Sequence, residues 1–197
     1  MTTPNEPQIK GAAIREFLLW HATKFGQEET AKLAADLPEP LAALIDRSQP
    51  AFGILGASWY PARLVHPMLD RLAERGGHEG RDFAREANRE VVPRMIRGVY
   101  RVMFQAAATP ELYARHVPRL WRRLHSTGDR SIVLRAPGEA LSVVESWPAH
   151  HPVLCWVTIY TMAHVFEAMG YKQWTVERLA CVSHGAGRCE TLLHYRK

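Results

Sequence analysis

The chain has 197 residues, of which 47% are hydrophobic and 23% charged, and its formal net charge is +5. These proportions exclude a disordered or low-complexity chain, and the length favours one domain over two. The N-terminal segment lacks the basic start and apolar run of a secretory signal, and no apolar stretch approaches the length of a membrane span, so we expect a cytoplasmic protein. The positive charge is mild, and no nucleic-acid-binding motif accompanies it, so we do not expect nucleic acid as a partner.

The first part of the chain is predicted to be helical from its apolar spacing. The predicted helices cover residues 9–25, 28–46, 59–75, 81–107 and 110–125. Pro38 and Pro40 are expected to interrupt the second helix, and Pro93 to kink the fourth. Ser58 and Thr109 are the expected N-caps of the third and fifth helices.

From residue 128 onward the apolar pattern changes from helical to alternating. The predicted elements are two short strands around a turn at residues 137–138, an apolar helix over residues 153–169, and a hairpin of residues 172–183 and 188–196. Helices followed by mainly antiparallel strands indicate an α+β fold. We expect a single domain, 1–197, with a mainly helical part, 8–127, and a strand–strand–helix–strand–strand part, 128–197.

The three cysteines, Cys155, Cys181 and Cys189, are the most informative residues. An odd number of cysteines in a reducing compartment does not indicate a disulfide framework. Cys155 lies near the start of the apolar helix and the other two lie on opposite arms of the hairpin, so docking of the hairpin on the helix could bring the sulfurs together. Thiolates are preferred zinc ligands. Three ordinary buried cysteines are the alternative.

The C-terminal segment, residues 151–195, carries a combination of motifs. They are Cys155-Trp156, the helix end Met169-Gly170, Glu177 on the next strand, and Cys181 followed through Gly185 by Cys189. With these features the segment resembles 4-vinyl-reductase domains, including the ligand-sensing domains of phenol- and xylene-responsive activators. The order of elements also resembles an uncharacterised myxobacterial family. These families are similar in fold to haem-dependent nitric-oxide-binding domains and to components of a vesicle-tethering particle.

The resemblance implies a structural zinc ion bound by Cys155, Cys181 and Cys189. The implied fourth ligand is Glu177, with His184 as the alternative, because Glu177 lies four residues before Cys181 and the family pattern has three. The nitric-oxide sensors pair a proximal histidine with a Tyr-x-Ser-x-Arg signature. This signature is absent here, so we do not expect haem.

Sensor members of the family enclose an apolar ligand between helices and sheet, so the resemblance implies a non-catalytic domain that senses a small hydrophobic or aromatic molecule. The candidate ligand-binding residues are Tyr100, Phe104, Trp121, Trp156, Tyr160 and Trp174, with Met95, Val99, Met103 and Trp147 beside them. Such side chains are also typical of an ordinary core. No serine or cysteine has an identifiable catalytic base, so we do not expect an enzyme.

The alternative function is a ligand-free interaction or adaptor module of the same fold. Its dimer face would come from the N-terminal helices, with Ile14, Phe17, Leu18 and Trp20 as contributors. The chain carries no ATPase, kinase or DNA-binding motif of its own. For either function we therefore expect output through a homodimer or through an unknown protein partner.

Overall fold

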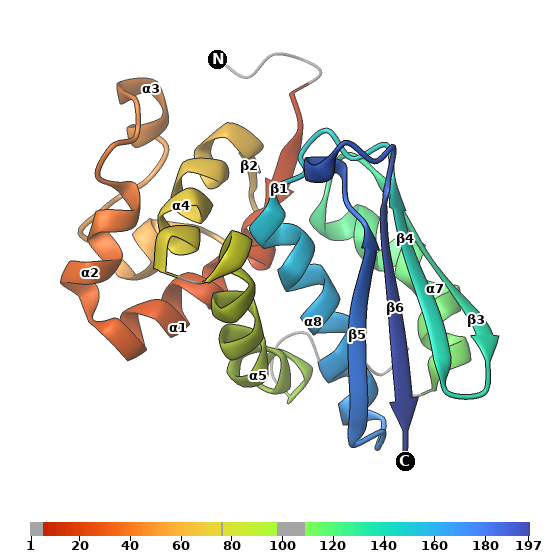
Figure 1. The fold of residues 1–197 in the computed structure, drawn as a ribbon. Coiled ribbons are helices and arrows are strands. Elements are labelled where there is room, and N and C mark those ends of the chain that lie inside the picture. The colour runs from red at the N-terminus through yellow and green to blue at the C-terminus, as the bar shows by residue number, and fades with distance from the viewer. Residues whose placement is uncertain (1–5, 76, 98–108) are drawn as a thin grey trace.

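The structure, a computed structural model, describes residues 6–75, 77–97 and 109–197. The N-terminal part is mainly helical (Figure 1). Its elements are β1 (Gln8–Lys10), η1 (Gly11–Ala13), α1 (Arg15–Phe25), α2 (Gln27–Ala31), η2 (Lys32–Ala34), α3 (Glu39–Ala42), η3 (Pro50–Gly53), β2 (Trp59–Pro61), α4 (Ala62–Arg75), η4 (His78–Gly80) and α5 (Arg81–Arg97).

The C-terminal part contains a four-stranded antiparallel sheet. Its elements are α7 (Pro110–Leu124), β3 (Asp129–Ala136), β4 (Glu139–Glu145), α8 (Pro152–Ala168), β5 (Gln173–Ala180), η5 (Val182–His184) and β6 (Cys189–Arg196). The strand order across the sheet is β3-β4-β6-β5, and each neighbouring pair is antiparallel. The predicted α+β class and the order strand, strand, helix, strand, strand are confirmed.

Two predicted helices begin later than the sequence pattern indicated. Residues 8–10 and 59–61 form a small antiparallel ribbon in which Ile9 pairs with Tyr60, and α4 begins only at Ala62. Ser58 is therefore not the N-cap of α4. Ile9 is fully buried, so pairing with a distant segment and burial override the local helical spacing.

The helices before and after the undescribed segment agree with prediction at their described ends. Pro93 lies inside α5, and the predicted continuation of this helix to residue 107 falls outside the described residues. Thr109 caps α7, because its Oγ1 accepts a hydrogen bond of 3.3 Å from the backbone N–H of Leu112. Pro110 occupies the first turn, where its missing N–H costs nothing.

Helix α8 lies between the N-terminal helices and the sheet (Figure 1). It packs on α4 and α5 on one side and on β5 and β6 on the other, so it is apolar around most of its circumference. His151 caps its start, with Nδ1 accepting from the N–H of Val153 at 3.2 Å. Gly170, at φ 98°, follows its last turn in a conformation that other residues adopt only with strain. This helix therefore fixes the relative position of everything packed on it.

The residues expected to form an exposed dimer face lie inside the chain. Ile14, Leu18 and Trp20 are buried, and Phe17 packs against Phe83 with ring centroids 6.5 Å apart. These side chains fill the core between α1 and the neighbouring helices, so they are not available as a face for a second copy. Within the described residues, none of the helices combines the length and apolarity needed to cross a membrane.

Candidate functional site

The three cysteines come together where the β5–β6 hairpin packs on the start of α8. Cys155 lies in the second turn of the helix, Cys181 follows β5, and Cys189 begins β6. The Sγ atoms of Cys155 and Cys181 are 3.9 Å apart, as are those of Cys181 and Cys189. All three residues are buried and none forms a disulfide. The sequence-based expectation that docking gathers these sulfurs therefore agrees with the geometry.

His150, just before α8, is the fourth member of this group, which we call the thiolate centre. Its Nε2 is 3.4 Å from Cys181 Sγ, and the four possible ligand atoms all lie within 4.8 Å of one another. Trp147 packs edge-on against its ring, with centroids 5.1 Å apart. The histidine pair before α8 is visible in the sequence, but its place beside the sulfurs depends on the loop after β4, which no local pattern specifies.

The two predicted fourth ligands lie elsewhere. Glu177 is on the exposed face of β5, because its neighbour Arg178 takes the face toward α8 and side chains alternate along a strand. His184 is half exposed, and its Nε2 bonds Glu79 Oε1 at 2.7 Å. Neither belongs to the thiolate centre.

The electrostatics of the thiolate centre favour a negative charge on the Cys181 sulfur, which the neighbouring groups stabilise. Hydrogen bonds from Cys155 and Cys189 hold the pKa of the Cys181 thiol well below its ordinary range and outweigh its burial. The same sulfur contacts raise the pKa of Cys155, so that thiol stays protonated. Burial alone would lower the pKa of His150, but its hydrogen bonds to Cys181 and Cys189 and their negative charge raise it to about 9.

The sulfur spacing matches that of a tetrahedral metal centre. With metal–sulfur bonds of about 2.3 Å, tetrahedral coordination places two sulfurs roughly 3.8 Å apart, and Cys181 Sγ lies 3.9 Å from the sulfurs of both Cys155 and Cys189. Three sulfurs and one imidazole nitrogen form a donor set that soft, thiophilic metal ions prefer. The arrangement can therefore hold such an ion without large rearrangement.

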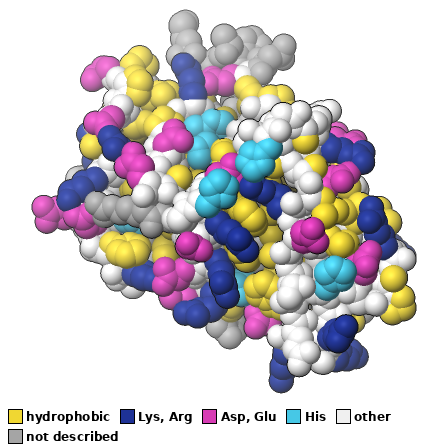
Figure 2. Space-filling view, in the orientation of Figure 1, with side chains coloured by type: hydrophobic (Ala, Val, Ile, Leu, Met, Phe, Trp, Pro, Cys, Tyr) yellow, Lys and Arg dark blue, Asp and Glu magenta, His cyan; other side chains and the backbone are white. Residues whose placement is uncertain are grey.

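A second polar group lies beside the thiolate centre. Glu79 accepts hydrogen bonds from Arg178 at 2.6 Å and from His184 at 2.7 Å, and the Arg178 guanidinium stacks on Trp156 at 4.3 Å. Burial would raise the pKa of Glu79, but these two hydrogen bonds lower it. His78 joins Glu79 and His184 in a group of possible ligand atoms within 4.8 Å. Figure 2 shows histidine, acidic and basic side chains gathered on one face of the molecule.

A cavity of about 100 Å³ lies between α1, α5, α7 and α8, and we call it the α7 cavity. It is lined by Ala13, Phe17, Val92, Met95, Tyr113, Val117, Leu120, Trp121, Leu124, His125, Arg130, Leu154, Val157, Thr158 and Thr161. Most of these side chains are apolar, and the main charged or titratable groups are His125 and Arg130. The cavity is thus an apolar space with a polar portion.

Both polar residues of the α7 cavity are buried and incompletely bonded. His125 is 7% exposed, and among the described residues its Nδ1 has no hydrogen-bond partner. Its ring stacks on Trp121 with centroids 3.9 Å apart. Burial and the charge of Arg130 lower the pKa of His125 to about 3, so the imidazole is neutral. Arg130 is 6% exposed; its Nε donates to Ser142 Oγ at 3.2 Å, while its Nη2 has no partner in the described chain.

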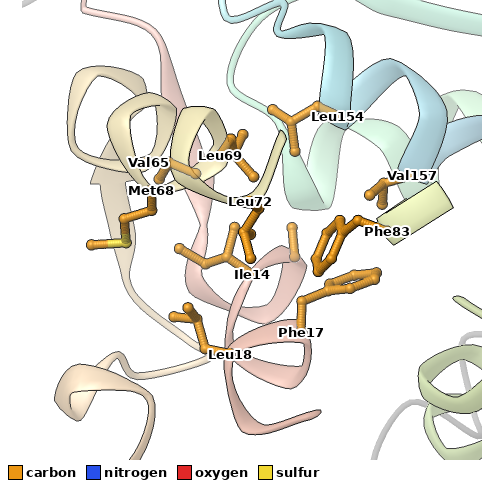
Figure 3. A pocket seen from close by; sticks show the side chains of 11 residues that line it. Ile14, Phe17, Leu18, Val65, Met68, Leu69, Leu72, Phe83, Leu154 and Val157 are labelled. Atoms are coloured by element: carbon orange, nitrogen blue, oxygen red, sulfur yellow. The ribbon is translucent and has the colours of Figure 1, made fainter. Parts of the chain in front are cut away.

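A smaller, wholly apolar cavity of about 20 Å³ adjoins the first (Figure 3). Phe17, Leu154 and Val157 line both spaces. Figure 3 shows these three side chains together with Phe83 where α1, α5 and α8 converge.

Of the six predicted ligand-binding residues, one lines the α7 cavity, namely Trp121. Trp156 and Tyr160 pack against each other with ring centroids 6.0 Å apart, and Trp174 meets Tyr160 edge-on at 6.4 Å. The other two, Tyr100 and Phe104, lie outside the described residues.

The sequence pattern did not single out His125 and Arg130. One signal for Arg130 was present, because on β3 it shares the inward face with Ile132, where an apolar residue is expected. No comparable signal marks His125. Its importance depends on the packing of α7 against distant residues.

Solved structures of similar fold come from the H-NOX proteins. One is an H-NOX protein from S. oneidensis in the Fe(II)NO ligation state, with 12% identity, a TM-score of 0.67, and coverage of 96% of this chain and 100% of that chain. Another is the Fe(II) unliganded H-NOX protein from K. algicida, with 12% identity, a TM-score of 0.67, and coverage of 96% and 97%. A third, from a study of heme distortion in the H-NOX family, has 9% identity, a TM-score of 0.64, and coverage of 96% of both chains. At these identities the likeness establishes an H-NOX-like fold and no more.

No protein-family model and no curated protein matches the chain. The resemblance to 4-vinyl-reductase domains therefore has no support from a family match, whereas the fold relationship to haem-dependent nitric-oxide-binding domains is confirmed.

The sequence-based cofactor prediction is corrected by these neighbours. The sequence analysis predicted zinc and no haem. The solved structures of this fold, however, include one in the Fe(II)NO ligation state, one in the Fe(II) unliganded state and one from a study of heme distortion. The prediction failed because it relied on cysteines and on a missing short signature, and neither reports the fold. In this chain, the α7 cavity is smaller than the roughly 300–1,000 Å³ typical of drug-sized ligands, and haem is larger still. As the described residues pack, the α7 cavity does not fit haem.

Proposed function

We propose that this chain is a non-catalytic, small-molecule-sensing domain with an H-NOX-like fold, and that its ligand occupies the α7 cavity. One observation carries this proposal. A cavity of about 100 Å³ is lined by two buried, incompletely bonded nitrogen-bearing side chains, those of His125 and Arg130. Protein interiors are close-packed and their buried polar atoms are normally bonded. The α7 cavity brings together two such nitrogen-bearing side chains, one of them charged, in a space that a small molecule could fill.

The position of the α7 cavity supports a signalling role. Its walls come from α1, α5, α7 and α8 together with Arg130 of β3, so they include the helical part and the sheet. A ligand in this space contacts both parts at once. Occupancy can therefore change the free energy of their mutual packing, which is what a sensor requires.

The most reactive group that the structure describes supports a non-catalytic role. The Cys181 sulfur, whose thiol pKa is lowered, belongs to a residue only 1% exposed and is surrounded by the other members of the thiolate centre. A nucleophile must reach its substrate. We therefore assign Cys181 to structure and not to catalysis.

We infer that the thiolate centre holds a thiophilic metal ion through Cys155, Cys181, Cys189 and His150. The sulfur spacing and the mixed sulfur and nitrogen donor set support this inference. A bound ion would join the β5–β6 hairpin to α8 and so stabilise these two strands, which lie at the opposite edge of the sheet from β3.

Thermal unfolding with a panel of small molecules tests the sensing proposal. The panel contains small aromatics, short-chain acids, their amides and haem. A ligand that binds only the folded chain stabilises it by about 2.7 kcal/mol at a hundred times its Kd. We expect at least one probe to raise the melting temperature in a concentration-dependent manner.

The matched control is Val157→Phe, which places a large side chain in the wall shared by the two cavities. We expect this variant to remain folded by circular dichroism and to lose the response to the same probe. A panel with no effect on the wild type, or an equal effect on both proteins, would overturn the proposal.

A further inference from the structure

Arg130 is a buried cation without a carboxylate partner. It lies on the inward face of β3 and is 6% exposed. Its one described side-chain hydrogen bond is to the neutral Ser142 hydroxyl, at 3.2 Å. In residues 6–75, 77–97 and 109–197, no carboxylate oxygen forms an ion pair with it within 4.0 Å.

The remaining residues cannot supply the missing charge. Residues 1–5, residue 76 and residues 98–108 contain no aspartate and no glutamate. A guanidinium stays protonated at any ordinary pH, and burial of an unpaired charge is costly. No carboxylate side chain of the described residues therefore pairs with Arg130, and the other residues of the chain have none to offer.

The second unbonded nitrogen belongs to the same cavity. His125 lies at the end of α7 with its ring held between Trp121 and Trp147, at centroid distances of 3.9 and 5.5 Å. In its Nδ1–H tautomer the neutral imidazole donates one hydrogen bond. A charged donor and a neutral donor thus line one cavity whose other walls are largely apolar.

We propose that His125 and Arg130 form a carboxylate subsite, and that the α7 cavity takes a small hydrophobic monocarboxylate. The carboxylate accepts hydrogen bonds from the Arg130 guanidinium and from the His125 imidazole, and the apolar body packs against α5 and α7. This assignment rests on the proposed sensing function, because it names the ligand class of the same cavity.

Charge and size both narrow the ligand class. The subsite carries one positive charge, since the imidazole is neutral, so a monoanion balances it and a dianion such as a phosphate does not. An apolar cavity of about 150 Å³ is known to hold benzene, and the α7 cavity is smaller, at about 100 Å³. Short branched acids, such as isobutyrate or isovalerate, suit this volume better than long or polycyclic ones.

Calorimetric titration of the full chain with matched acids and amides tests the assignment. The probes are isobutyrate and isovalerate, their uncharged amides, and sulfate as an anion without an apolar body. We expect each acid to bind at least about tenfold more tightly than its amide, because a hydrogen bond to a charged group contributes about 1.5–3 kcal/mol. Sulfate is expected to bind more weakly than either acid.

Two variants complete the test. In Arg130→Met we expect the preference for acid over amide to disappear while the fold is kept. The control is Arg135→Met, because Arg135 lies on the same strand but is exposed, and we expect it to retain the preference. Equal binding of acids and amides by the wild type, or an unchanged preference in Arg130→Met, would overturn the carboxylate subsite and leave the sensing proposal standing. Absence of binding by every probe, acids and wider panel alike, would overturn both.

Discussion

The thiolate centre and the α7 cavity both contain buried polar side chains, but only the first brings them into mutual contact. In the thiolate centre, sulfurs lie 3.9 Å apart and an imidazole nitrogen lies 3.4 Å from Cys181 Sγ. In the α7 cavity, the side chains of His125 and Arg130 line a space of about 100 Å³, and each carries a buried nitrogen that has no partner in the described chain.

This difference indicates what each region still needs. Converging donors can be bridged by one ion, which is what we propose for the thiolate centre. Unpaired donors beside a space can be bonded by a small molecule that also fills the space, which is what we propose for the α7 cavity. One region therefore suits structural stabilisation, and the other suits reversible occupancy.

The largest expected effect comes from the thiolate centre. Substitution Cys181→Ala removes the sulfur that contacts both other cysteines and His150, so we expect loss of the bound metal and of about 3–4 kcal/mol of unfolding free energy. Elemental analysis for iron through zinc, together with urea denaturation, measures both changes.

The matched controls for this prediction are Glu177→Ala and His184→Ala, because the structure places neither residue in the thiolate centre. Both variants should keep the metal. A well-folded wild type without metal, or metal that persists in Cys181→Ala, would contradict the inference.

The next largest effect concerns the pH dependence of the free energy of unfolding, to which His125 in the α7 cavity contributes. The folded-state pKa of His125 is lowered to about 3, so between that value and 6.5 the unfolded chain binds a proton that the folded chain excludes. Stability therefore falls as the pH drops below 6.5, by up to about 1.4 kcal/mol per pH unit from this residue. In His125→Phe, which keeps an aromatic ring between the tryptophans, we expect this contribution to disappear.

Urea denaturation between pH 7 and pH 4.5 measures the difference between wild type and His125→Phe. Burial also lowers the pKa values of the partly buried His66 and of His151, so both contribute to the slope in both proteins and cancel in the comparison. Identical slopes would show that His125 is not held neutral by burial.

Much of the fold was predictable from local patterns, and the exceptions share a cause. The cap at Thr109, the strands around residues 137–138 and the terminal hairpin all follow from residue types and spacing. The strands β1 and β2 could not be predicted in this way, because their pairing joins segments about fifty residues apart in the sequence.

The candidate sites divide in the same way. Three members of the thiolate centre were predictable because cysteine is rare and chemically distinctive. The fourth, His150, was one histidine among ten, and only the docking of the hairpin distinguishes it. His125 and Arg130 gain their importance from missing partners, and a missing partner is a property of packing that no sequence pattern displays.

A smaller effect is expected from the unpaired charge itself. Substitution Arg130→Met removes a buried cation and keeps most of the side-chain volume, so without ligand we expect the chain to gain about 1.5 kcal/mol of unfolding free energy. Urea denaturation checks the gain. A loss of stability would show that Arg130 already has a partner in the folded chain.

The smallest expected effect on stability comes from the N-cap of α7, a helix that lines the α7 cavity. Thr109→Ala removes the cap of α7, the helix that carries Trp121 and ends beside His125, and should cost about 1 kcal/mol. Thr109→Ser, which keeps the hydroxyl, is the control and should cost much less. Thermal unfolding of the two variants distinguishes them, and equal losses would show that the hydroxyl does not contribute.

The central claim is that the α7 cavity binds a small molecule, and calorimetric titration of the best-binding probe into wild type and Val157→Phe tests it most directly. The account predicts saturable binding near one molecule per chain in the wild type, and loss of binding in the variant with the filled cavity. Binding of equal affinity by both proteins, or no binding by the wild type, would contradict it.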